Sequence, residues 1–194
     1  GKFLEVVGEK LWVRGVTYGT FRPNSEGMLF PERHVVAHDL AAMAVHGINA
    51  IRIYTLPARW LLDLAAANGI RVLVGFDWPV HVTFLESRKQ AREIEARVRE
   101  GARLLAGHEA ILGWSLGNEI PGPVVRWHGR RRVERFLAGL CDEVRTQDPA
   151  GLVSYVSYPT TEYLELPFLD FASFNVYLES RDRLAAYLAR LQNL

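Results

Sequence analysis

The stretch that decides the fold runs from residue 47 to residue 76 and reads GINAIRIYTLPARWLLDLAAANGIRVLVGF. It holds a β-branched apolar run over 48–54, a helical pattern over 57–67 and a second apolar run over 70–76. The pattern predicts strand, helix and strand, with Pro57 in the first turn of the helix and Gly69 in a left-handed cap after it. Two strands joined through a helix lie parallel, because parallel neighbours need a crossover connection.

The same pattern recurs on both sides of this stretch. We expect further strands over residues 11–18, 111–118, 152–158 and 171–177. We expect helices over 31–46, 86–106, 131–147 and 181–192, and a short helix or loop over 160–166. Pro31 opens the first of these helices and Gly47 closes it, as Pro57 and Gly69 do for the next. The sequence therefore predicts an α/β protein with a parallel sheet.

A parallel sheet of this kind is either an open doubly wound sheet or a barrel. No Gly-rich phosphate loop follows any strand, and Gly15 and Gly19 lack the spacing of a dinucleotide site. Along 111–118 one face carries small and polar residues while the other carries Trp114 and Leu116. A face that turns polar toward the strand's carboxyl end favours a barrel mouth over a sheet covered on both sides. We therefore expect a (β/α)8 TIM barrel that is incomplete, with about six of its eight units.

The composition excludes several classes of protein. A net charge of +1 gives no general field for nucleic acid or for a membrane surface. No apolar run reaches the roughly 18 residues that span a bilayer. The single cysteine, Cys141, falls in a helical pattern, where core packing is favoured over a catalytic thiol. His34 and His38 have a spacing that can hold zinc, but a packing or surface role is favoured, and we expect no metal and no cofactor.

Polar side chains gather where the expected strands end, which is where barrel enzymes place their chemistry. The members of this set are Tyr18, Arg52, Tyr54, Asp77, Asn118, Glu119, Asn175 and Tyr177. Glycoside hydrolysis needs a carboxylic acid that protonates the leaving oxygen and a second carboxylate that attacks the sugar or activates water. Glu119 is our candidate for the acid, and Asn118 beside it is a candidate for binding a sugar 2-hydroxyl. Trp78 is a candidate for a sugar subsite, although packing is an equal alternative.

The segment Trp114-Ser115-Leu116-Gly117-Asn118-Glu119-Ile120-Pro121 resembles the strand 4 motif of the clan A glycoside hydrolases. The closest resemblance is to the barrel domain of family 2, the group of β-galactosidase, β-glucuronidase and β-mannosidase. It implies a retaining β-glycosidase in which Asn118 contacts the 2-hydroxyl and Glu119 is the acid/base. It also implies that Arg52 and Tyr177 position a nucleophile. Further segments match in order over nearly the whole chain, at 39–49, 62–70, 108–111 and 174–177.

One feature departs from the family pattern. The clan's nucleophile is a glutamate at the end of strand 7, whereas this chain ends at Leu194 within the sixth expected helix. We therefore expect residues 1–194 to be a single barrel domain truncated at its carboxyl end, with the nucleophile beyond it and the fragment inactive. Glu162 and Glu179 are the nearest internal candidates for a nucleophile, and solvated loop roles are preferred for both.

Other hypotheses stay open at this point. The first is a non-catalytic carbohydrate-binding or scaffolding barrel of a multidomain polysaccharide-processing or glycosyltransferase protein. The second is an open α/β binding protein of another class. The expected partner is a carbohydrate, and unpaired edges of an incomplete barrel give a route to a homo-oligomer. A cytoplasmic location is slightly favoured, because no signal peptide is visible in the sequence.

Overall fold

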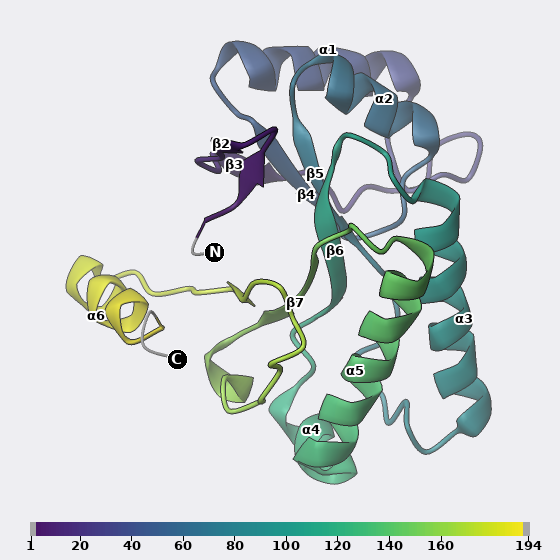
Figure 1. Cartoon of the computed structure of the whole chain (residues 1–194), viewed down its shortest axis with the longest axis vertical. Coiled ribbons are helices and arrows are strands. Elements are labelled where there is room, and N and C mark those ends of the chain that lie inside the picture. Colours follow the sequence, from purple (N-terminus) through teal and green to yellow (C-terminus); the bar gives the residue numbers. More distant parts are fainter. Residues whose placement is uncertain (1–2, 192–194) are drawn as a thin grey trace.

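The computed structural model describes residues 3–191 and shows a six-stranded parallel sheet curled as a half-barrel (Figure 1). The strands are β3 (Gly15–Thr17), β4 (Ala50–Ile53), β5 (Arg71–Gly75), β6 (Ile111–Asn118), β7 (Val153–Ser157) and β8 (Ser173–Phe174). Their order in the sheet is their order in the sequence. A doubly wound sheet reverses its strand order at a switch point, and this sheet does not. The prediction of an incomplete TIM barrel is confirmed, and the open α/β alternative is wrong.

The helices lie mainly on the convex side of the sheet (Figure 1). They are α1 (Arg33–Val45), α2 (Arg59–Ala67), α3 (Arg88–Leu105), α4 (Gly122–His128), α5 (Arg130–Gln147) and α6 (Arg181–Leu191). The last of them, α6, lies apart from the others and buries none of its described residues. Residues 1–2 and 192–194 lie outside the described part of the chain, and with them the expected end of the last helix at 192.

The core lies between the sheet and the helices on its convex side. The outward face of β6 contributes Trp114 and Leu116, both fully buried, and the Trp114 ring stacks on Phe76 with ring centres 5.4 Å apart. Helices α3 and α5 pack against each other over this part of the sheet. The alternation seen in the sequence of β6 therefore divides it into a core face and a face toward the barrel interior.

Both glycine caps form as expected. Gly47 and Gly69 have φ of +78° and +67°, in the left-handed region that suits glycine. The residue after each glycine closes the helix: Ile48 N–H donates to Met43 O at 3.0 Å, and Ile70 N–H donates to Ala65 O at 2.9 Å. These are the bonds of the Schellman motif.

The expected position of the prolines is wrong. Helices α1 and α2 begin at Arg33 and Arg59, so Pro31 and Pro57 stand before the N-cap rather than inside the first turn. The N-cap residues Glu32 and Ala58 have ψ of 147° and 148°, which is extended backbone. The helical turn therefore starts only after each of them.

Several other elements differ from expectation. The outer strands β3 and β8 are much shorter than the expected 11–18 and 171–177. The segment 160–166 agrees with the expected short helix or loop, since it is a loop that begins with the 3-10 turn Pro159–Thr161. Helix α4 and a hairpin of β1 (Glu5–Val6) with β2 (Glu9–Lys10) were not expected. No helix within residues 3–191 combines the length and the apolar character that crossing a membrane requires.

Candidate active site

Four polar side chains meet at the carboxyl ends of β4, β6 and β8, although they are far apart in the sequence. Arg52 of β4 donates through one terminal nitrogen to Asn118 Oδ1 at 2.6 Å and through the other to Asn175 Oδ1 at 3.0 Å. The amide of Asn175 donates to Asn118 Oδ1 at 3.0 Å and to Glu119 Oε1 at 2.5 Å. The fork of the guanidinium fixes both asparagine side chains, and Asn175 in turn orients the Glu119 carboxylate.

Two tyrosines complete this network. The Tyr177 hydroxyl donates to Glu119 Oε1 at 3.3 Å, although 77% of the Tyr177 residue is exposed. Partial desolvation and the charge of Glu119 raise the pKa of Tyr177. The guanidinium of Arg52 lies over the Tyr54 ring, 4.6 Å from its centre. Burial lowers the pKa of Arg52, yet guanidinium stays charged in proteins, so the network holds a permanent cation beside Glu119.

The backbone of Glu119 has an unusual conformation. Its φ is +48°, in the left-handed region that residues other than glycine seldom adopt and that costs on the order of 1–3 kcal/mol. Hydrogen bonds on both sides hold the turn. Glu119 N–H donates to Val156 O at 2.9 Å, and Ile120 N–H donates to the hydroxyl of the buried Tyr155 at 2.8 Å. The turn carries the carboxylate off the end of β6 toward Asn175.

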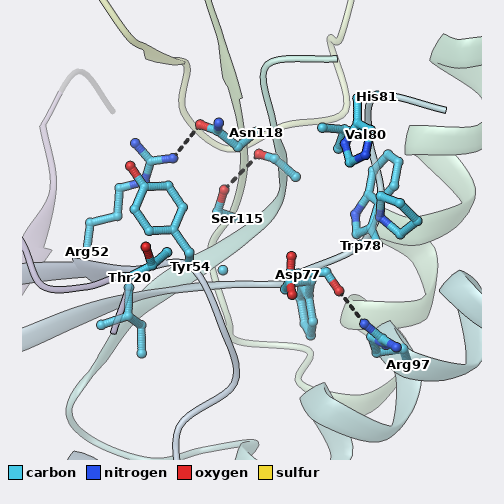
Figure 2. Close-up of a pocket in the computed structure, with 15 residues that line it drawn as sticks. Thr20, Arg52, Tyr54, Asp77, Trp78, Val80, His81, Arg97, Ser115 and Asn118 are labelled. Carbon is cyan, nitrogen blue, oxygen red and sulfur yellow. Dashed lines mark hydrogen bonds between the residues drawn. The ribbon is translucent and has the colours of Figure 1, made fainter. Parts of the chain in front are cut away.

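A pocket of about 390 Å³ lies next to this network (Figure 2). Five of the residues expected from the sequence line it, namely Arg52, Tyr54, Asp77, Trp78 and Asn118. Two glycines line the pocket at close approaches, since a Cβ on Gly75 would stand 2.7 Å from Ile53 O of the neighbouring strand and one on Gly117 would stand 2.9 Å from the Trp78 ring. The strand ends therefore form a cavity that is polar on the Arg52 side.

Trp78 is built into the core more than into the cavity. Only 4% of the residue is exposed, its indole N–H donates to Leu116 O at 2.7 Å, and its ring packs edge-on against Phe84 and Phe136. Only an edge of the ring reaches the pocket wall. Asp77 is exposed, and its main-chain oxygen accepts a hydrogen bond from Arg97 at 2.6 Å.

Tyr18 lies outside the main network. It is buried, and its hydroxyl donates to Asp39 Oδ2 at 2.7 Å. Burial, together with this bond and the charge of Asp39, raises the pKa of Tyr18. Its ring lines a second, smaller compartment of about 120 Å³, which shares the residues Thr20, Tyr54 and Asp77 with the first pocket.

Residues 1–193 match the family model described as glycosyl hydrolases family 2, TIM barrel domain. The chain belongs to this family. No curated protein matches it. Among solved structures, the β-glucuronidase of Bacteroides uniformis superimposes with a TM-score of 0.78 at 18% identity, over 96% of this chain and 24% of that one. For a β-glucuronidase of Parabacteroides merdae the TM-score is 0.75 at 17% identity, over 96% and 24% of the two chains.

A third similar structure is the β-glucuronidase of Ruminococcus gnavus, with a TM-score of 0.72 at 14% identity over 94% of this chain and 34% of that one. The family 2 barrel described by residues 3–191 thus spans between a quarter and a third of the length of these proteins. At such identities the likeness shows the shared fold. Membership of the family places the chain among domains of glycoside hydrolases.

Within this family 2 barrel, Glu162 and Glu179 stand away from the pocket. Glu162 lies in a loop and is partly exposed, and its carboxylate accepts from both terminal nitrogens of Arg190, at 2.7 and 2.6 Å, and from the Tyr187 hydroxyl at 2.8 Å. The Arg190 bond lowers the pKa of Glu162, while desolvation and the Glu162 bond raise the pKa of Tyr187 to about 12. Glu162 ties α6 to the loop after β7. Glu179 is exposed in the loop before α6.

The structure also brings Thr20 and Arg97 to the pocket, and neither was expected there. Thr20 comes from the loop after β3 and Arg97 from the middle of α3. Nothing in the local sequence sets Arg97 apart from the other arginines of that charged helix. Within residues 3–191, no group of three or more His, Cys, Asp or Glu side chains is close enough to hold a metal ion.

Proposed function

We propose that this barrel carries the acid/base part of a retaining β-glycosidase site, with Glu119 as the acid/base. The observation that carries the proposal is the bond from Asn175 to Glu119 within the Arg52–Asn118–Asn175 network, beside an open pocket at the barrel mouth. Barrel enzymes place catalytic residues at this end of the strands. The strained backbone of Glu119 supports the same assignment, since such strain clusters at functional sites.

The hydrogen bonds assign separate tasks to the two carboxylate oxygens of Glu119. Oε1 accepts from both Asn175 and Tyr177, whereas Oε2 has no partner within residues 3–191. In the first step Oε2 carries the proton to the departing glycosidic oxygen, and in the second step it removes a proton from water. Asn175 holds Oε1 during both steps.

Asn118 is suited to the 2-hydroxyl of the sugar for a similar reason. Its Oδ1 accepts hydrogen bonds from Arg52 and Asn175, which fixes the orientation of the Asn118 side chain and leaves Nδ2 as a donor. This nitrogen has no hydrogen-bond partner in the described part of the chain. It therefore donates to a sugar hydroxyl, a contact that strengthens in the transition state of glycoside hydrolysis.

The nucleophile of a retaining enzyme is a second carboxylate about 5–5.5 Å from the first. We place it on a segment outside residues 3–191, because Glu162 is committed to Arg190 and Glu179 lies in another loop. Arg52 and Tyr177 are then its positioning residues. The substrate is a β-linked carbohydrate, and the β-glucuronidases of similar fold make a β-glucuronide one member of the test panel.

The test is hydrolysis of a panel of chromogenic β-glycosides by the full protein and by two matched variants. Glu119→Gln removes the acid, while Glu109→Gln makes the same change at an exposed position just before the other end of β6. We expect at least one substrate to be cleaved, with Glu119→Gln reducing turnover at least a hundredfold and Glu109→Gln leaving it unchanged. Full activity of Glu119→Gln on every cleaved substrate would contradict the proposal.

A non-catalytic carbohydrate-binding barrel is the second candidate function. It is favoured by the single carboxylate, Asp77, among the described residues that line the pocket. This candidate predicts that the full protein binds a sugar from the panel and cleaves none. Binding that is lost in Arg52→Ala, without turnover by the wild type, would establish it in place of hydrolysis.

A further inference from the structure

The smaller compartment beside the pocket has an apolar floor. It lies between the loop 19–30 and the carboxyl ends of β4 and β5, and its floor is made by Tyr18, Phe21, Leu29 and Phe30. Tyr18 and Phe30 are buried, and the Phe21 ring stands edge-on to the Tyr18 ring with centres 4.9 Å apart. An apolar floor favours the binding of an apolar group, because moving apolar surface out of water is favourable.

The boundary between the two compartments carries polar side chains. Thr20, Tyr54 and Asp77 line both compartments and so mark their shared boundary. In Figure 2 the Tyr54 hydroxyl points toward Arg52. Within residues 3–191 neither the Thr20 hydroxyl nor the Asp77 carboxylate has a hydrogen-bond partner. The boundary thus offers one free hydroxyl donor and one free carboxylate acceptor.

Size and charge limit what can enter the smaller compartment. Its volume of about 120 Å³ equals that of about four water molecules, which is too little for a sugar ring and enough for about four non-hydrogen atoms. None of the described residues that line it is a lysine, arginine or histidine. The Asp77 charge at the boundary repels an anionic substituent such as a carboxylate or sulfate.

We propose that this compartment receives the N-acyl group of an acylamido sugar whose ring lies in the main pocket. The amide N–H donates to Asp77, the amide oxygen accepts from the Thr20 hydroxyl, and the terminal methyl group packs between Phe21, Leu29 and Phe30. An ester or ether of the same size lacks the N–H and leaves Asp77 without its donor. The inference rests on the proposed function and names its substrate class.

The test compares matched pairs of methyl β-glycosides of gluco, galacto and manno configuration. Each pair carries either a hydroxyl or an acetamido group at C3, C4 or C6, so that the 2-hydroxyl assigned to Asn118 is kept. An O-acetyl ester at the same carbon serves as a third ligand. Dissociation constants are measured by calorimetry on the full protein. We expect one acetamido sugar to bind about tenfold more tightly than its hydroxyl partner, because a methyl group is buried and a hydrogen bond forms.

Two variants with the same substitution locate this preference. Leu29 is 41% exposed and lines the compartment, so Leu29→Trp fills it while leaving the core intact. Leu104 is 57% exposed on α3, outside both compartments, and Leu104→Trp is the control. We expect Leu29→Trp to abolish the tenfold preference and to spare binding of the hydroxyl sugar, and Leu104→Trp to change neither.

The outcomes separate this inference from the function on which it rests. Equal binding within every pair, an O-acetyl ester as tight as the amide, or a preference that survives in Leu29→Trp would each overturn the N-acyl proposal. The proposed function would still stand if the full protein cleaved a β-glycoside of the panel and Glu119→Gln abolished that turnover. Binding of no sugar in the panel would overturn both.

Discussion

The side-chain amide of Asn175 donates to Glu119 Oε1 at 2.5 Å, although 56 residues separate the two in the sequence. This contact joins the end of β6 to the residue that follows the short strand β8. A hydrogen bond to a charged group contributes about 1.5–3 kcal/mol, so the contact strongly constrains the Glu119 carboxylate. Its geometry exists only when the two strand ends are brought together in the barrel.

The first prediction concerns this contact. Asn175→Ala removes the donor to Glu119 and the acceptor of Arg52, so the carboxylate loses its main constraint. We expect kcat/KM on the best substrate of the full protein to fall about 10- to 100-fold. The control is Asn68→Ala, since the side-chain amide of Asn68 donates a hydrogen bond only to the main chain of its own helix. A fall of the same size in Asn68→Ala would contradict a local role for Asn175.

The second prediction contrasts two glycines. A Cβ at Gly75 would stand 2.7 Å from Ile53 O and 2.9 Å from Tyr54 O, which are main-chain atoms of the neighbouring strand and its end. Gly75→Ala should therefore lower the free energy of unfolding by about 1–3 kcal/mol. A Cβ at Gly139 on α5 meets nothing within 4 Å, so Gly139→Ala should raise that energy by about 0.5–1 kcal/mol. Urea denaturation measures both, and equal effects would argue against the packing of β5 on β4.

The third prediction is a pH dependence of stability. His128 is buried, with only 8% of the residue exposed. Its Nε2 accepts a hydrogen bond from Leu85 N–H at 3.5 Å. Burial, with a further contribution from Arg132, lowers the pKa of His128. Below about pH 6.5 His128 binds a proton in the unfolded state but stays neutral in the folded state. The free energy of unfolding therefore decreases as the pH falls below that value.

Unfolding measured by urea at pH 7.5 and pH 5.5 checks this linkage. In the pH range where His128 is protonated only in the unfolded state, it should lower the free energy of unfolding by up to about 1.4 kcal/mol for each unit by which the pH falls. His128→Gln should lose less stability than the wild type over this interval. His34 is exposed, and His34→Gln should behave as the wild type does. An unchanged slope in His128→Gln would show that the histidine is not the cause.

The fourth prediction concerns the attachment of α6. This helix buries none of its described residues, and Glu162 holds it through Arg190 and Tyr187. Both charged side chains are partly exposed, so solvent screens the pair and its contribution to the free energy of unfolding is small. In Glu162→Gln, amide hydrogens of residues 181–191 should exchange about fivefold faster. Exchange in the same segment should stay at the wild-type rate in Glu109→Gln, and an equal rate in both variants would show that α6 is held by other contacts.

The strand and helix order follows from local chemistry, which explains why it could be predicted. Gly47 and Gly69 end their helices in the left-handed region, and the alternation around Trp114 and Leu116 marks the core face of β6. The hairpin β1–β2 gave no such signal. Its turn places Val7 at φ +52°, a conformation that β-branched residues rarely adopt. Helix α4 was hidden because a glycine and a proline stand in its first turn.

The site could be predicted only in part. Arg52, Asn118 and Asn175 stand at the ends of recognisable strands, so their meeting follows from the parallel sheet. The positive φ of Glu119 depends on Val156 and Tyr155, which belong to the next strand. The place of Arg97 at the pocket depends on the packing of α3 on the sheet. Contacts between distant segments of this kind leave no local pattern in the sequence.

The central claim is that Glu119 is the acid/base, and rescue of Glu119→Ala by azide tests it most directly. A dinitrophenyl β-glycoside of the sugar that the wild type cleaves needs little acid assistance, so the variant should form its glycosyl intermediate and then stall for want of a base. Azide needs no base, and its addition should raise the steady-state rate at least tenfold and yield the β-glycosyl azide. A variant that stays inactive with azide, or one that turns over at the wild-type rate without it, would contradict the assignment of Glu119.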